Sequence, residues 1–268
     1  MKLKIASFNI KNDEKANKEK NANILINIIK KEKIDILGTQ ELTKEYEETL
    51  KKKLPDYKFY GKYRYGNGIF SKFKYNENNI IITNKKVRFN KTIWLPWLAN
   101  NFKDLKNSII KKSITPRIVT MITISDKDLG KIIVFNTHLD YKIHSIKKRQ
   151  LEKLEKIIFK YKKRYPTILT GDFNMNEEDL DFKKFVLNLE EKGIKKIKIR
   201  NNTYISPNGK KNTIDHIFIP SNWKIIESGV IDNENISDHR PIYVLIDIEK
   251  KIQENKYAQI IRKAFKIK

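Results

Sequence analysis

The stretch of sequence that decides the fold reads TILTGDFN at residues 167–174. Its first five residues predict a short buried strand, and a carboxylate and an amide follow where that strand ends. Taken alone, Gly-Asp-Phe-Asn could form an ordinary turn, because Asp and Asn side chains hydrogen-bond to nearby backbone groups. Its interpretation therefore depends on what stands at the ends of the other predicted strands.

Polar residues recur at the ends of those strands, each beside a buried apolar run. In chain order the motifs are SFNI at 7–10, QE at 40–41, NTHLD at 136–140, GDFN at 171–174, IDHIF at 214–218 and SDHRP at 237–241. Each has an ordinary structural explanation, with Asn9 as a turn residue, Glu41 as a helix cap and His138 as a hydrogen-bonded core histidine. The functional prediction depends on their joint occurrence and their order.

Strand-like runs alternate with amphipathic segments along the chain. Strands are predicted at residues 2–10, 34–38, 131–137, 167–171, 213–219, 224–231 and 242–248. Apolar residues at helical spacing predict helices over 22–29 and 151–161, and MNEE at 175–178 is expected to open another. The segment 62–112 lacks clear periodicity and is expected to hold a strand or two plus a long loop. Two halves that each mix strands and helices predict sheets packed face to face with helices outside.

Composition narrows the class of protein. The 268 residues include no cysteine, so any metal must bind oxygen or imidazole ligands. No apolar run reaches the roughly 18 residues of a membrane span, and the N-terminus alternates at once, so we expect a cytoplasmic protein and a monomer. The net charge of +25 attracts polyanions, although the crowding of lysine, isoleucine and asparagine also indicates an AT-rich genome. Nucleic acid is the expected partner, and an anionic membrane is the alternative.

The polar motifs resemble, as an ordered set, those of the endonuclease/exonuclease/phosphatase superfamily of deoxyribonuclease I-like hydrolases. The residues that carry the resemblance are Asn9, Glu41, His138, Asp172, Asn174, Asp215, Asp238 and His239. It extends from Lys2 to about Ile248 and implies an α/β (α+β) fold. In that four-layered α/β sandwich, two mixed β-sheets pack face to face with helices on both outer faces.

The same resemblance divides the chain into two parts. Residues 1–249 would form the catalytic domain, and residues 250–268 a basic amphipathic tail that we expect to be helical. A helix packed on the domain is the simpler interpretation of the tail, and a helix that binds a membrane surface or nucleic acid is the alternative.

The resemblance also implies a metal site and a hydrolytic water. Glu41 would be the main ligand of Mg²⁺, with Mn²⁺ as an alternative ion, Asn9 beside it and Asp238 as a further acidic ligand. Mg²⁺ prefers oxygen ligands and keeps several waters, so few protein carboxylates suffice. Asp172 is similar to the family residue that activates the attacking water, and Asn174 to the residue that donates hydrogen bonds to the pentacovalent phosphate.

Two histidines complete the implied catalytic set. His138 and His239 resemble the residues that contact the phosphate and exchange protons, and which of them is the acid stays open. A histidine in such a role needs an acceptor on its other nitrogen, which selects its tautomer. We expect Asp215 to orient His138 and Asp238 chiefly to orient His239.

Three further residues are candidates for substrate binding. Arg117 lies where many family members place an arginine near the scissile phosphate; it would bind phosphate bidentately or pair with a surface carboxylate. Trp94 and Trp97 flank a short WLPW loop that could stack on unpaired bases, enter a lipid interface or pack against the domain.

These features predict a Mg²⁺-dependent hydrolase of phosphate esters. We favour a phosphodiesterase or nuclease that acts on nucleic acid by metal-assisted attack of a water activated by Asp172. The alternative is a lipid or inositol phosphate hydrolase at a membrane surface, and a catalytically silent binding module is the third hypothesis. The complete catalytic set argues against the third, because a silent relative should have lost at least one of Glu41, Asp172 or His239.

Overall fold

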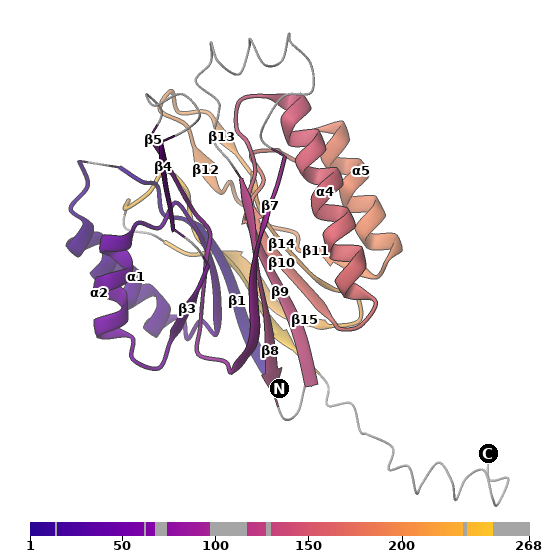
Figure 1. Ribbon diagram of the computed structural model, residues 1–268, viewed down its shortest axis with the longest axis horizontal. Helices are drawn as coiled ribbons and strands as arrows, with labels where there is room; N and C mark the ends of the chain where they lie inside the picture. The colour runs from indigo at the N-terminus through magenta and orange to yellow at the C-terminus, as the bar shows by residue number, and fades with distance from the viewer. Residues whose placement is uncertain are drawn as a thin grey trace, which may run out of the picture.

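The computed structural model describes residues 1–13, 15–61, 63–67, 74–96, 117–126, 130–232 and 235–248. In this part of the chain two six-stranded mixed sheets pack face to face (Figure 1). The first sheet has the order β15 (Lys224–Val230), β16 (Ile242–Asp247), β1 (Lys2–Asn9), β2 (Ile36–Gln40), β6 (Ile80–Thr83) and β3 (Lys58–Tyr60). The second has the order β11 (Ile194–Lys196), β14 (Asp215–Pro220), β10 (Thr167–Asp172), β9 (Gly130–His138), β8 (Ile118–Asp126) and β7 (Val87–Trp94). Two short antiparallel ribbons pair β4 (Tyr63–Asn67) with β5 (Lys74–Asn78) and β12 (Tyr204–Ile205) with β13 (Lys211–Asn212).

Helices cover both outer faces of the sandwich. α1 (Lys18–Lys31) and α2 (Lys44–Lys53) lie outside the first sheet, and α4 (His144–Lys162) and α5 (Leu180–Glu191) lie outside the second (Figure 1). Three hydrophobic clusters separate the layers, one between the sheets and one between each sheet and its helices. The four-layered α/β sandwich predicted from the sequence is therefore confirmed. Within the described residues, no helix is long and apolar enough to cross a membrane.

Strand β9 shows why these apolar runs form buried strands. Successive side chains of a strand point to opposite faces of its sheet. Ile132 and Val134 accordingly belong to the cluster between the sheets, whereas Ile133 and Phe135 pack beneath α4 and α5. A strand covered on both faces needs apolar residues at every position, which is why this segment reads as a continuous apolar run rather than an alternating one.

In β9 and β10, the side chains that face the other sheet are apolar in the first part of the strand and become polar toward its C-terminal end. In β9 this face continues from Val134 to Asn136 and then His138, and in β10 it continues from Ile168 through one threonine to Asp172. The core between the sheets therefore ends in a polar layer, and the charged residues lie beyond that layer.

An uncharged network forms this polar layer. Gln40 Nε2 donates to Asn136 Oδ1 at 2.7 Å, and Asn136 Nδ2 donates to the carbonyl of Thr39 at 2.8 Å. The sheets approach closely here, because a Cβ on Gly38 would lie 2.2 Å from Thr170 Oγ1. Buried polar groups that are paired in this way avoid the cost of burial without a partner. The network joins the two sheets directly beneath the candidate site.

Helix α5 begins later than the sequence predicted. The expected start at Met175 is wrong: the helix begins at Leu180. Asp179 is the N-cap, and its side chain accepts hydrogen bonds from the backbone N–H groups of Asp181 and Phe182. The residues between the GDFN motif and this cap therefore form a turn, with Asp179 N donating to the carbonyl of Asn176 at 3.2 Å.

The segment 62–112 holds more strands than the one or two expected. Its described parts form β4, β5, β6 and β7. β7 lies at the edge of its sheet with most of its residues exposed, so its sequence lacks the apolar alternation that marks a strand. The tail 250–268 lies outside the described residues, and its predicted helix stays a prediction.

Candidate active site

The polar ends of neighbouring strands place several predicted site residues side by side. Asp172 of β10 is in register with His138 of β9 and with Asp215 of β14. Asn9 ends β1 of the other sheet, and its amide reaches Asp172 across the space between the sheets. All four side chains are almost completely buried. Strand register thus assembles the centre of the site from segments that are distant in the sequence.

Asn9 links the two carboxylates that the sequence assigned to metal binding and water activation. Its Nδ2 donates to Glu41 Oε1 at 3.2 Å and to Asp172 Oδ2 at 3.0 Å. Glu41 Oε2 accepts the backbone N–H of Asn12 at 2.9 Å, which holds the second oxygen in place. Glu41 and Asp172 therefore converge on one point, from the ends of strands in different sheets.

Residues of the site adopt a strained backbone. Glu41 has φ 60°, Asn174 has φ 50° and Lys11, just after Asn9, has φ 59°. Left-handed conformations of non-glycine residues cost about 1–3 kcal/mol each and persist only where the surroundings enforce them. Their presence at three turns around one point is the pattern expected of a functional site.

Asp172 lies at the centre of the site and adjoins residues from several segments. Its Oδ1 accepts the backbone N–H of Asn174 at 2.8 Å, and its Oδ2 accepts from Asn9. The same Oδ2 lies 3.4 Å from Nε2 of His138 and 3.8 Å from Nε2 of His239. Burial raises the pKa of Asp172 to about 7, against the opposing effect of the positive charge on His239. A carboxylate with a pKa near neutrality is suited to accept a proton.

His138 is held neutral. Arg117 Nη1 lies 2.9 Å from His138 Nδ1, and a guanidinium only donates, so Nδ1 must be the unprotonated nitrogen. The proton therefore resides on Nε2, the nitrogen that faces Asp172. Burial and the charge of Arg117 both lower the pKa of His138 well below its usual value. His138 is thus arranged as a neutral hydrogen-bond donor.

His239 is held charged instead. Its Nδ1 lies 2.9 Å from Asp215 Oδ2. Burial lowers the pKa of His239, but the negative charges of Asp215 and Asp172 outweigh burial and raise the pKa to about 10. At neutral pH His239 therefore donates through Nδ1 to Asp215 and carries a second proton on Nε2. The two histidines face one carboxylate with different protonation states.

The structure corrects the predicted orienting pairs. Asp215, expected to orient His138, instead contacts His239, because the turn at 237–239 brings that ring over the start of β14. Asp238, expected to orient His239, forms an ion pair with Lys11 at 3.1 Å. The Ser237 hydroxyl donates to the carbonyl of Asn9 at 2.7 Å and accepts the N–H of His239. This turn directs His239 inward and leaves Asp238 on the Lys11 side.

Asn174 already uses one of its amide hydrogens. Its Nδ2 donates to the backbone carbonyl of Leu139 at 3.0 Å. An amide nitrogen carries two hydrogens, so a phosphate oxygen could still accept the other. The role of Asn174 as a phosphate ligand stays a prediction.

The donor set, in which Asn9 and Asp172 are buried and Glu41 is half-buried, fits a divalent metal. Glu41 and Asp172 present carboxylate oxygens to one amide nitrogen, so two negative groups converge where a positive partner is needed. Ligand atoms of Asp172, Asp215 and His239 also lie within 4.8 Å of one another, but the charged His239 has no nitrogen lone pair to offer a metal, so only the carboxylates of this group are candidate ligands. Oxygen donors of this type are those that Mg²⁺ prefers. The predicted ligand Asp238 is paired with Lys11, on one side of this convergence.

The three substrate-binding candidates differ in position. Arg117 is 4% exposed and contacts His138, and its two predicted roles, binding phosphate and pairing with a carboxylate, stay predictions. The carbonyl of Arg117 accepts the N–H of Leu95 at 2.8 Å, which joins the end of β7 to the edge of the site. Trp94, directly before Leu95, is 36% exposed. Trp97 lies outside the described residues.

Two contacts of the site were not predicted. The ring of Tyr204 packs against the His239 ring with centroids 4.8 Å apart. The Thr203 hydroxyl accepts the backbone N–H groups of Ile214 and Asp215, which anchors the start of β14. Both residues lie at or beside a two-residue strand in the polar stretch 201–212, where no periodicity marks them. The aromatic residue inside that polar stretch was the only available signal.

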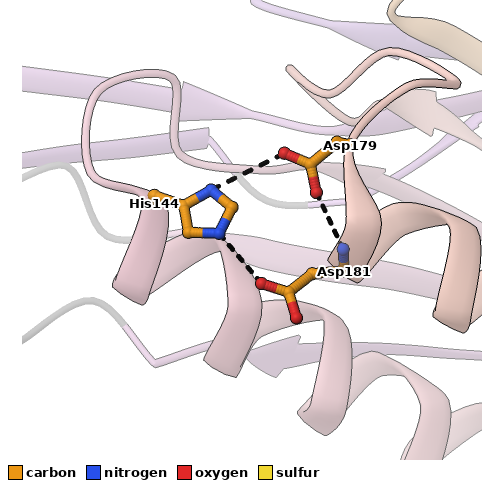
Figure 2. A group of neighbouring side chains, drawn as sticks. All are labelled: His144, Asp179 and Asp181. Atoms are coloured by element: carbon orange, nitrogen blue, oxygen red, sulfur yellow. Dashed lines mark hydrogen bonds and ion pairs between the residues drawn. The ribbon is translucent and has the colours of Figure 1, made fainter.

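A second cluster of histidine and carboxylates lies on the surface. His144 contacts Asp181 Oδ2 at 2.9 Å through Nε2 and lies 3.6 Å from Asp179 Oδ2 through Nδ1 (Figure 2). Its side chain is 61% exposed, and Lys148 also pairs with Asp181 at 3.4 Å. Asp179 additionally caps α5. The cluster joins the N-termini of α4 and α5.

Comparison with known proteins identifies the fold. The model of the endonuclease/exonuclease/phosphatase family matches residues 6–239. A family protein from Bacteroides thetaiotaomicron superposes with a TM-score of 0.73 at 21% identity, over 92% of this chain and 99% of that one. A mannosyl-6-phosphatase from the same organism gives 0.71 at 22% identity, over 92% and 100%. TDP2 from D. rerio, solved with a single-strand DNA product, gives 0.69 at 18% identity, over 92% and 99%. Comparison with curated proteins gave no significant match.

The family match covers most of the chain and contains every residue that carries the predicted resemblance, from Asn9 to His239. The structures that resemble it cover the same sandwich with nearly their whole length. The chain belongs to the endonuclease/exonuclease/phosphatase family and is a phosphoester hydrolase.

Proposed function

We propose that the chain is a divalent-metal-dependent phosphodiesterase that acts on nucleic acid by attack of a water that Asp172 activates. The observation that carries this proposal is the point at which Glu41, Asn9 and Asp172 meet. A phosphodiester is already anionic, so attack by water needs a proton acceptor and neutralisation of charge at one place. Of the two carboxylates that meet at this point, Asp172 supports the first requirement as proton acceptor, and Glu41 supports the second as the ligand of a neutralising cation.

Asp172 is the proton acceptor of this mechanism. It takes a proton from the attacking water while the water oxygen forms its bond to phosphorus. Its pKa, raised to about 7 by burial, makes it a stronger base than an exposed carboxylate while leaving much of it ionised at neutral pH. The contacts with Asn9 and with the N–H of Asn174 orient the carboxylate.

The two histidines act on the phosphate in different ways. His138 donates an Nε2 hydrogen bond to a non-bridging oxygen, and Arg117 holds it in that tautomer. His239 is protonated and opposes the negative charge that grows on the phosphate. When the bond from phosphorus to the leaving oxygen breaks, that oxygen takes the Nε2 proton of His239. Asp215 keeps His239 oriented during this transfer.

Glu41 would hold Mg²⁺ or Mn²⁺ with Asp172 beside it, and Asn9 would reach the ion through Oδ1, which here accepts the N–H of Lys11 at 3.0 Å. The bound cation would neutralise charge on a phosphoryl oxygen and on the leaving oxygen. The αL backbone of Glu41 and the contact of its second oxygen with the N–H of Asn12 hold the carboxylate for that purpose. Asp238 is a weaker candidate ligand, because Lys11 neutralises it.

Nucleic acid is the substrate class that the charge supports. The net charge of +25 attracts a polyanion, and the half-exposed Trp94 borders the Arg117 edge of the site, where an unpaired base could stack. The similarity to TDP2, solved with single-strand DNA, agrees with this substrate. The similarity to a mannosyl-6-phosphatase makes a phosphate monoester the second candidate.

A comparison of substrates tests the proposal. Wild-type protein should hydrolyse bis(4-nitrophenyl) phosphate and single-stranded DNA in Mg²⁺ and lose this activity in excess EDTA. A protein that cleaves 4-nitrophenyl phosphate or mannose 6-phosphate but no diester would be a monoesterase. Activity confined to phospholipid vesicles would identify a membrane-surface hydrolase. Glu41→Gln should raise the Mg²⁺ concentration needed for half-maximal rate, because it removes the charge and keeps the volume.

We also propose that residues 1–249 form a catalytic domain that works as a cytoplasmic monomer. A chain that ends at residue 249 should keep the hydrolytic rate of the full chain and elute as a monomer in light-scattering chromatography. A dimer, or loss of the rate on removal of residues 250–268, would contradict this organisation.

A further inference from the structure

Lys147 differs from its neighbour Lys148, at the start of α4, in the direction of its side chain. It lies one turn into the helix, half-buried, and its Nζ donates to the backbone carbonyl of Asn174 at 3.0 Å. The next residue, Lys148, is 53% exposed in its side chain and pairs with Asp181 at the surface. The two adjacent lysines therefore have different contacts: Lys147 binds the Asn174 turn, and Lys148 forms an ion pair at the surface.

The position of Lys147 is electrostatically unfavourable for an ordinary surface lysine. A positive charge near the N-terminus of a helix opposes the helix dipole, and α4 has no acidic residue in its first turn. Burial lowers the pKa of Lys147, and the nearby charges of Asp179, Asp140 and Asp172 act in the opposite direction. The acidic residues that compensate for this burial include the proposed catalytic carboxylate. The helix alone gives no reason for a lysine here.

The contact of Lys147 completes the hydrogen bonding of a strained turn. Asn174 has a left-handed backbone with φ 50°. Its N–H donates to Asp172 Oδ1 at 2.8 Å, and its Nδ2 donates to the carbonyl of Leu139 at 3.0 Å. Its carbonyl accepts from Lys147. These three polar groups of Asn174 are thus held from three different segments, and Lys147 holds the backbone carbonyl.

We propose that Lys147 is a positioning residue for the hydrolytic reaction, which holds the Asn174 turn so that Asp172 keeps its orientation toward the attacking water. The two ends of this chain of contacts are Lys147 Nζ and Asp172 Oδ2, joined through the backbone of Asn174 and Asp172 Oδ1. Nothing in this geometry brings Lys147 to the phosphate. The inference rests on the proposed role of Asp172.

Three variants test the inference with bis(4-nitrophenyl) phosphate in Mg²⁺. Lys147→Met should lower kcat between about 10-fold and 100-fold, the range expected when a catalytic group is slightly displaced. KM should stay within about twofold, because substrate contacts are untouched. Lys147→Arg keeps charge and donor and should recover most of kcat. Lys148→Met, on the neighbouring position, should keep the wild-type kcat and KM. A Lys147→Met protein with wild-type kcat would overturn the inference.

A double-mutant cycle checks that Lys147 acts through Asn174. In the background of Asn174→Ala, the loss of kcat caused by Lys147→Met should be smaller than in wild type, because the shared turn is already loosened. Additive losses would show that Lys147 acts by another route and would overturn the inference. If Lys147→Met does not fold, Lys147→Gln keeps a donor without the charge and replaces it in both comparisons.

Amide exchange tests the same contact without any catalytic measurement. Deuterium uptake of a peptide that covers residues 172–178 should be faster in Lys147→Met than in wild type and unchanged in Lys148→Met. Equal uptake in all three proteins overturns the inference even if the hydrolysis assay fails. If the wild-type protein cleaves no phosphodiester and Lys147→Met still takes up deuterium faster than wild type, the contact between Lys147 and the Asn174 turn stands and the proposed function fails.

Discussion

Two clusters of this molecule each combine one histidine with two aspartates, and each brings its ligand atoms within 4.8 Å of one another. Asp172, Asp215 and His239 meet where strands end between the sheets, and the His239 side chain is 7% exposed. His144, Asp179 and Asp181 meet at the ends of two surface helices, where the His144 side chain is 61% exposed (Figure 2). Their compositions are the same, and their surroundings differ.

The difference shows how burial changes the electrostatics of a cluster made of the same residue types. Charges buried between sheets interact strongly because little water screens them, and the pKa of Asp172 and that of His239 both depart from their usual values. Exposed ion pairs are screened and contribute little. The buried cluster also adjoins Glu41 through Asn9, whereas the surface cluster adjoins Lys148 and a helix cap.

The largest effect should come from Asp172→Asn. The amide cannot accept a proton from water, so kcat should fall by about 10³-fold to 10⁴-fold. Single-turnover hydrolysis of bis(4-nitrophenyl) phosphate measures the loss, and Asp181→Asn in the surface cluster is the matched control. Comparable losses of kcat in the two variants would show that the buried and the surface cluster do not differ in their importance for the reaction.

Asp215→Asn should have the next largest effect. It leaves His239 without the negative partner that keeps it charged and oriented, so kcat should fall by about 10²-fold to 10³-fold. The pKa of His239, followed by NMR titration of its ring, should drop from the raised value of about 10. Asp238→Asn is the control, because Asp238 pairs with Lys11. A stronger effect of Asp238→Asn than of Asp215→Asn would restore the orienting pair predicted from the sequence.

His216 provides a third case for the comparison, because it is buried and, within the part of the chain that the structure describes, contacts a backbone carbonyl rather than a carboxylate. It is 1% exposed, with Nε2 3.0 Å from the carbonyl of Met175 and its ring stacked on Phe182 at 4.4 Å. Burial lowers the pKa of His216 to about 4. The unfolded chain takes up this proton near pH 6.5 and the folded chain resists it down to about pH 4. Stability is therefore lost as the pH falls through this window, by about 3 kcal/mol in total.

Urea unfolding of wild type and His216→Gln measures this contribution. The glutamine cannot titrate, so its free energy of unfolding should fall less than that of wild type between pH 7 and pH 4.5. Equal pH slopes for the two proteins would show that His216 does not resist protonation.

The smallest effect should come from His144→Gln. Because the surface cluster is screened by water, the free energy of unfolding should change by less than about 1 kcal/mol, and kcat should keep its wild-type value. Thermal unfolding and the hydrolysis assay measure the two quantities. A fall in kcat like that of Asp215→Asn would assign the surface cluster a part in the reaction.

Much of the sandwich followed from local patterns. The apolar run at 132–135 and the TILTGDFN stretch predicted β9 and β10 closely, because a strand covered on both faces needs apolar residues throughout. Edge strand β7 was missed because most of its residues face solvent. The start of α5 was misplaced because Asp179, four residues after Met175, provides the cap.

The sequence by itself determined which residues border the strands, because each one stands at or near one end of an apolar run that forms a strand. Only the tertiary structure decided how they pair: Asp215 with His239, Arg117 with His138 and Lys147 with Asn174. These partners lie 24, 21 and 27 residues apart and on different elements. Strand register and the turn at 237–239 determine which of several nearby carboxylates contacts each histidine. No local pattern in the sequence predicts that pairing.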